Sequence, residues 1–132
     1  MKNKNKPIII CIDDEAVILN SLKTQLKSAF GDQYSYEIAE NGYDALELIE
    51  ELEQQQANIA VIVSDWLMPG IKGDELLIKI HQKFPKVIKL MLTGQADKEA
   101  IDRARIQANL QGCLKKPWSE EELIQSIHSA IG

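Results

Sequence analysis

Five segments of the chain carry the apolar pattern of β-strands, and each is followed by polar or turn-forming residues. The predicted strands are residues 7–12, 34–39, 59–63, 87–92 and 112–115. Unbroken apolar runs rich in β-branched residues, as at 59–63, are typical of strands buried on both faces of a parallel sheet. The segment 34–39 alternates apolar with polar residues, as a half-exposed strand does.

Between and after these segments, apolar residues recur at the spacing of amphipathic helices. The predicted helices comprise residues 18–29, 45–52, 76–84, 96–108 and 119–131. Helix 96–108 has a weak apolar face of mostly small residues, so we expect loose packing there. The last helix opens with Ser119-x-x-Glu122, the spacing of a capping box. Five strand–helix alternations predict an α/β fold with a doubly wound parallel sheet, covered by helices on both faces.

Composition narrows the class of protein. The chain has 132 residues, of which 45% are apolar and 27% charged, as expected for one globular domain. We expect a single domain over residues 1–132, with residues 1–6 as a flexible tail. A net charge of -5 argues against a general nucleic-acid or anionic-membrane binder. No segment resembles a complete signal peptide or membrane span, which favours a cytoplasmic location.

Acidic residues stand at the ends of two predicted central strands. Asp65 follows residues 59–63 and precedes the loop-forming Pro69-Gly70, whereas Asp13 and Asp14 follow residues 7–12. Each acid alone is more often a turn residue or helix cap, and Asp13 or Asp14 could cap the first helix. If the two strands are neighbours, the three carboxylates converge and require a compensating cation. Their hard oxygen ligands suit magnesium.

Two further polar residues end predicted strands. Thr93 follows residues 87–92, and Lys116 follows residues 112–115. Singly, Thr93 before a glycine is usually a turn hydroxyl, and Lys116 before a proline is usually a solvated side chain. A carboxylate beside magnesium, a hydroxyl and an ammonium nevertheless forms an arrangement that accepts a phosphoryl group.

With these residues in place, the chain resembles the receiver domain of two-component response regulators from about Ile8 to Ile131. The matching residues are, in chain order, Asp13-Asp14, Asp65 with Met68-Pro69-Gly70, Thr93, and Lys116-Pro117. No single motif is specific to this family, but the ordered set of motifs along the chain is a strong match to it. The resemblance implies a flavodoxin-like receiver fold with strand order 2-1-3-4-5.

The resemblance also implies a function and a site. A histidine kinase or a histidine phosphotransfer protein would phosphorylate Asp65, with Thr93 and Lys116 as the other catalytic residues. Asp14, Asp65 and the Leu67 carbonyl would ligate Mg²⁺, and Asp13 would assist through water. The phosphorylated domain would switch a downstream effector or an attached output module, and the family leaves room for a phosphorylation-dependent homodimer.

One feature of the sequence departs from the family pattern. The family usually has an aromatic residue three positions before its lysine, a position that Cys113 occupies here. A small thiol cannot exchange an exposed ring for a buried one, so we expect no switch through that side chain. Cys11 and Cys113 lie on strands that this order separates by about 14 Å, so we expect no disulfide between them. The resemblance also implies that the Lys116-Pro117 bond is cis.

Three other classes share parts of this pattern. A haloacid-dehalogenase-like magnesium phosphatase also forms an aspartyl phosphate, but it has Asp-x-Asp after its first strand. A flavodoxin-like electron carrier needs hydroxyls and amides in that loop, not acids. A receiver-like interaction module that never accepts phosphate would not need Asp65, Thr93 and Lys116 together. We therefore expect a response regulator receiver without multiple-turnover activity on external substrates.

Overall fold

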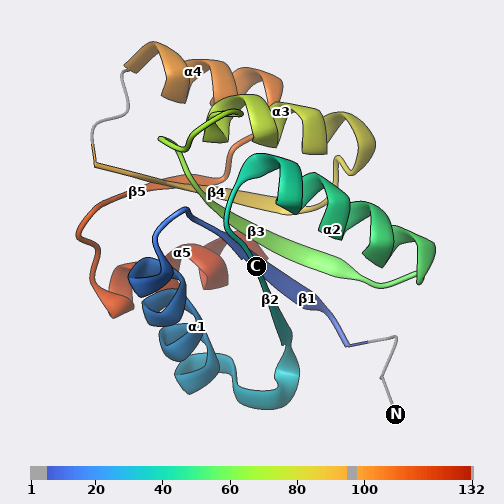
Figure 1. Ribbon diagram of the computed structural model, residues 1–132. Coiled ribbons are helices and arrows are strands. Elements are labelled where there is room, and N and C mark those ends of the chain that lie inside the picture. The colour runs from blue at the N-terminus through green and yellow to red at the C-terminus, as the bar shows by residue number, and fades with distance from the viewer. Residues whose placement is uncertain (1–5, 95–97, 132) are drawn as a thin grey trace.

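Strands and helices alternate along residues 6–94 and 98–131, the part of the chain that the computed structural model describes (Figure 1). The elements are β1 (Ile8–Ile12), α1 (Ala16–Phe30), η1 (Gly31–Gln33), β2 (Ser35–Ala39), α2 (Gly42–Gln54), β3 (Ile59–Asp65), α3 (Gly73–Lys83), β4 (Ile88–Thr93), α4 (Lys98–Gln107), β5 (Gly112–Lys115) and α5 (Glu120–Ile131). Most of the expected flexible tail, residues 1–5, lies outside the described residues.

The five strands form one parallel sheet in the order β2-β1-β3-β4-β5, which confirms the predicted fold class. Its register fixes where the strands end. Ile12 of β1 pairs with Ser64 of β3, so the acids that follow these two residues are level at one edge of the sheet. Thr93 of β4 pairs with Lys115 of β5, which brings the next residue, Lys116, to the same edge.

Helices cover both faces of the sheet, α2, α3 and α4 on one side and α1 and α5 on the other (Figure 1). Successive residues of a strand point to opposite faces, so a continuous apolar run supplies both cores. In β1, Ile10 and Ile12 belong to the core beneath α2, α3 and α4. Ile9 and Cys11 belong to the core beneath α1 and α5. All five residues of β1 are buried, which explains its unbroken apolar sequence.

The helix starts partly match their predictions. The capping box is confirmed: Ser119 Oγ accepts from Glu122 N–H at 3.1 Å, and Glu122 Oε1 accepts from Ser119 N–H at 3.3 Å. The N-cap of α1 is Glu15, whose side chain makes no capping bond, so the expectation that Asp13 or Asp14 caps this helix is wrong. Asp13 Oδ1 instead accepts from the N–H of Glu15 itself, at 2.9 Å.

Helix α4 buries only Ala100 and Ala104 among its residues, in agreement with its weak apolar pattern. It ends at Gln107, one residue before the predicted end, and the predicted start at Ala96 lies outside the described residues. No helix in the described part of the chain has the length and apolarity needed to cross a bilayer.

Both cysteines are free, which confirms that they do not pair. Strands β3 and β4 separate β1, which carries Cys11, from β5, which carries Cys113. Burial raises the pKa of Cys11 to about 12, so this thiol is protonated at neutral pH and acts as a small apolar side chain. Cys113 is only half-buried, and burial raises its pKa as well.

Candidate functional site

The acidic residues that end β1 and β3 meet in one pocket at the carboxyl edge of the sheet. Asp13 is fully buried, Asp65 is 4% exposed, and Asp14 is exposed. One carboxylate oxygen from each of the three lies within 4.8 Å of those of the other two. Thr93, at the end of the neighbouring strand β4, is 7% exposed. The convergence predicted from the strand ends is therefore present.

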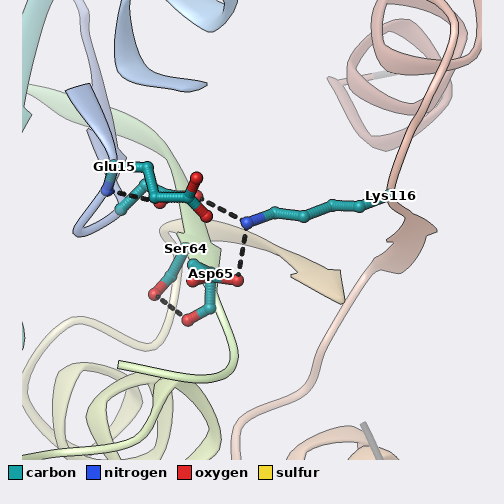
Figure 2. Close-up of polar contacts among 5 residues, drawn as sticks. Glu15, Ser64, Asp65 and Lys116 are labelled. Atoms are coloured by element: carbon teal, nitrogen blue, oxygen red, sulfur yellow. Dashed lines mark hydrogen bonds and ion pairs between the residues drawn. The ribbon is translucent and has the colours of Figure 1, made fainter. Parts of the chain in front are cut away.

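Lys116 enters this pocket from the chain that follows β5 (Figure 2). Its Nζ lies 2.9 Å from Asp13 Oδ2 and 3.0 Å from Asp65 Oδ1. Its backbone N–H donates to the carbonyl oxygen of Thr93 at 2.8 Å. The adjacent Lys115 is exposed, which agrees with the choice of the lysine directly before the proline. The Lys116-Pro117 bond is cis, as the resemblance implied.

Lys116 pairs with two of the three clustered carboxylates, and the pKa of Asp65 reflects both its burial and the charges around it. Burial raises the pKa of its carboxyl group most, and the charges of Asp13 and Asp14 raise it further, against the lowering effect of Lys116. Burial alone would lower the pKa of Lys116. The hydrogen bonds and charges of Asp13 and Asp65 outweigh burial, so that the pKa of Lys116 is raised. The cluster thus contains one more carboxylate than the two with which the Lys116 ammonium pairs.

The loop after Asp65 folds tightly against the end of β3. The N–H of Gly73 donates to the carbonyl oxygen of Trp66 at 2.7 Å, and a Cβ atom on Gly73 would lie only 2.2 Å from the carbonyl oxygen of Asp65. A glycine is therefore required at position 73. Gly70 has φ of 81°, a conformation that favours glycine. Leu67, the predicted carbonyl ligand, lies in this loop with 58% of its surface exposed.

Three polar residues near the pocket were not singled out from the sequence. Ser64 is buried in β3 and its hydroxyl donates to the carbonyl oxygen of Asp65 at 3.0 Å (Figure 2). Asp74, in the first turn of α3, accepts bonds from Trp66 and from Arg103 of α4. An acid in the first turn of a helix ordinarily indicates only a favourable interaction with the helix dipole, so the sequence carries no signal for these contacts.

The donor set of the pocket fits magnesium. Its three clustered groups are all carboxylates, of which the exposed Asp14 faces solvent and the buried Asp13 and Asp65 have Lys116 as a partner. Magnesium favours hard oxygen ligands, keeps several waters, and uses one or two carboxylates. It would also offset part of the negative charge of the three carboxylates.

Asp14→Asn is expected to weaken magnesium binding by about tenfold or more, because it removes a charged oxygen donor from the cluster. Glu15→Gln is the matched control, since it removes one exposed acidic charge at the next position, outside the cluster. A magnesium titration followed by amide chemical shifts in NMR measures both affinities. Equal weakening in the two variants would show that the general negative charge of this region binds the ion, rather than the three-carboxylate cluster.

The fold and the pocket together define a class: a doubly wound α/β domain that presents a buried carboxylate beside an ammonium at the carboxyl edge of its sheet. The chain belongs to the response regulator receiver domain family, whose sequence pattern matches residues 9–128. It is 30% identical over 127 residues to the chemotaxis protein CheY-3 of Vibrio cholerae, a match that covers 95% of this chain and 91% of that protein.

Solved structures support the same assignment. The signal receiver domain of an HD domain-containing protein from Pseudomonas fluorescens Pf-5 superposes with a TM-score of 0.84 at 28% identity, covering 96% of this chain and 95% of that one. A response regulator receiver domain protein from Clostridium thermocellum gives a TM-score of 0.82 at 27% identity, covering 95% and 94%.

Several relatives are much longer than this chain. The hydrogenase transcriptional regulatory protein HoxA of Cupriavidus necator is 29% identical over 73 residues, which are 55% of this chain and 15% of that protein. The match to hybrid signal transduction histidine kinase D of Dictyostelium discoideum, 28% identical, covers 93% of this chain and 7% of that protein. The chain thus spans a small part of these two relatives.

Membership of the family identifies residues 9–128 as a receiver domain. Receiver domains are signalling modules of two-component systems that interact with histidine kinases and output domains, and they bind Mg²⁺ at an acidic pocket. The family match favours this reading over the haloacid-dehalogenase and electron-carrier alternatives. A role as a phosphoryl acceptor fits both the family and the acidic cluster.

Proposed function

We propose that this chain is switched by phosphorylation of Asp65. The observation that carries the proposal is the place of the Asp65 carboxylate: at the end of β3, 4% exposed, 3.0 Å from the Lys116 ammonium, and clustered with Asp13 and Asp14. The carboxylate attacks the phosphorus of a phosphohistidine on a sensor kinase or phosphotransfer protein. A P–O bond to Asp65 forms, the P–N bond breaks, and the leaving imidazole takes up a proton.

The residues around Asp65 then hold the transferred group. Lys116 already bridges Asp13 and Asp65, so its ammonium stands where the oxygens of a phosphoryl group on Asp65 develop charge. The Thr93 hydroxyl binds another of these oxygens. Asp14, Asp65 and the Leu67 carbonyl would hold Mg²⁺, with Asp13 assisting through water. Magnesium bound there would supply positive charge to the phosphoryl oxygens.

The same proposal covers partners and location. The donor is a sensor histidine kinase or histidine phosphotransfer protein, and the recipient of the signal is a downstream effector or an output domain, with a phosphorylation-dependent homodimer as a further form. We place the protein in the cytoplasm, as one receiver domain over residues 1–132. It takes part in its own phosphorylation and dephosphorylation without turning over external substrates.

Intact-mass spectrometry tests the proposal directly. After incubation with a small phosphodonor such as phosphoramidate and with magnesium, the protein should gain the mass of one phosphoryl group, and reductive cleavage followed by peptide mapping should locate it on Asp65. Removal of magnesium with a chelator should stop the gain. A folded protein that gains no mass, or that is modified on another residue, would refute the proposal.

A further inference from the structure

A buried carboxylate outside the acidic pocket connects the residue next to Asp65 with helix α4. Asp74, in the first turn of α3, is 2% exposed. Its Oδ1 accepts from the indole N–H of Trp66 at 3.1 Å, and its Oδ2 accepts from Arg103 Nη1 at 2.7 Å. Trp66 directly follows Asp65, and Arg103 lies in α4. The Asp74 side chain therefore bonds both to the residue that follows β3 and to α4.

Trp66 is held firmly at its end of this connection. Its backbone N–H donates to the carbonyl oxygen of Leu92 at 2.8 Å, and its own carbonyl oxygen accepts from Gly73 at 2.7 Å. The ammonium of Lys72 lies 5.3 Å from the centroid of its ring, a cation–π contact. With backbone and side chain both fixed, a movement of the end of β3 is carried to Asp74.

In the described part of the chain, helix α4 packs against the face it covers mainly through small side chains, together with the partly buried Ile101. The residues that it buries are alanines, Ala100 and Ala104, whose small side chains remove little apolar surface from water. The side chain of Arg103 is 46% exposed, whereas the side chain of its partner Asp74 is 3% exposed. A charge-assisted bond to a buried carboxylate is stronger than an ordinary surface ion pair. The Arg103–Asp74 pair therefore adds a charge-assisted contact to the apolar packing between α4 and α3.

We propose that Asp74 and Arg103 are positioning residues that couple Asp65 to α4, with the Arg103–Asp74 pair restraining α4 in the position seen here. The coupling rests on the proposed function, in which the Thr93 hydroxyl binds an oxygen of a phosphoryl group on Asp65. Thr93 ends β4 and α4 begins four residues after Gly94, at Lys98. We infer that closure of Thr93 onto the phosphoryl group pulls on α4 and stretches the pair. The pair therefore opposes phosphoryl binding, and by linkage its loss favours that binding.

The probe is beryllofluoride, which mimics the phosphoryl group, added with magnesium to the whole protein. Arg103→Met is expected to tighten beryllofluoride binding by about three- to tenfold, although Arg103 is not part of the acidic pocket. Asp74→Asn should act in the same direction, because Asn keeps an acceptor for the Trp66 indole but loses the charge. Arg105→Met is the matched control, since it removes an exposed arginine of the same helix that has no bond to Asp74, and it should leave the affinity unchanged.

Two further measurements distinguish coupling from simple support of the fold. Without beryllofluoride, amide hydrogen exchange of residues 98–107 should be faster in Arg103→Met than in wild type. The double variant Asp74→Asn/Arg103→Met should bind beryllofluoride no more tightly than Arg103→Met, because the two residues act as one unit.

The outcomes separate this inference from the proposed function. If wild type binds beryllofluoride and Arg103→Met binds it with the same affinity, the coupling is refuted, even where exchange in α4 is faster. An equal effect of Arg105→Met would also refute it, since general charge would then explain the change. A folded wild type that binds no beryllofluoride would refute the proposed function itself and this inference with it.

Discussion

Asp65→Asn is expected to abolish phosphorylation and, at neutral pH, to raise the stability of the unphosphorylated protein. The amide keeps the shape of the side chain but cannot attack phosphorus. It also removes one carboxylate from the cluster of three, while Lys116 keeps its bond to Asp13. If the gain has the usual size of a single-substitution effect, about 1 kcal/mol, the midpoint of thermal unfolding should rise by roughly 4 °C.

The pH dependence of this gain follows from the raised pKa of Asp65. A carboxyl group whose pKa is higher in the folded than in the unfolded protein destabilises the fold once pH exceeds its unfolded pKa of about 4. This destabilisation grows as pH rises to the pKa that Asp65 has in the folded protein, and it persists at higher pH. The advantage of Asp65→Asn should therefore be present at pH 7, fall in acid, and shrink when magnesium stabilises the wild-type carboxylate.

Thermal unfolding of wild type and Asp65→Asn between acidic and neutral pH, with and without magnesium, measures the gain in stability. Intact mass measures phosphorylation. Glu40→Gln, at an exposed acid outside the cluster, is the control and should show no comparable gain. Phosphoryl transfer to folded Asp65→Asn would contradict the assignment of Asp65. A gain in stability that is the same at pH 7 and in acid would contradict the electrostatic explanation.

The central strands of this fold could be predicted because their sequence reflects burial on both faces. β1 is unbroken and apolar because its residues feed two cores, and Asp13 and Asp65 stand out because they interrupt such runs. The predicted strand at 59–63 was short by two residues, since polar Ser64 and Asp65 continue the ladder to β4. The strand order came from the family resemblance, because periodicity along one strand does not identify its neighbours.

Other features depend on contacts between distant segments. Asp74 and Arg103 are 29 positions apart, and neither has a local pattern that identifies its partner. Lys89 lies within the apolar strand β4 and is fully buried, with its ammonium bonded to the carbonyl oxygen of Val87. Burial lowers the pKa of this lysine. A lysine in an apolar run would ordinarily be read as an exposed position, and only the packing around it shows otherwise.

Lys116→Met is expected to slow phosphorylation of Asp65 by about a hundredfold, because it removes a preorganised positive charge from the position of the phosphoryl oxygens. The same change should tighten magnesium binding, since the pocket loses the Lys116 ammonium that pairs with Asp13 and Asp65. Lys115→Met is the matched control: the side chain is identical and adjacent, but exposed, and the change should affect neither property.

The opposite signs of these two effects make the test specific to Lys116. A variant that had merely lost structure would lose both phosphorylation and magnesium binding, whereas loss of the ammonium alone separates them. Phosphorylation rates come from intact mass over time with phosphoramidate, and magnesium affinities from NMR titration. Weaker magnesium binding in a folded Lys116→Met protein, or equal slowing in Lys115→Met, would show that the Lys116 ammonium does not have the role that its 2.9 Å and 3.0 Å contacts indicate.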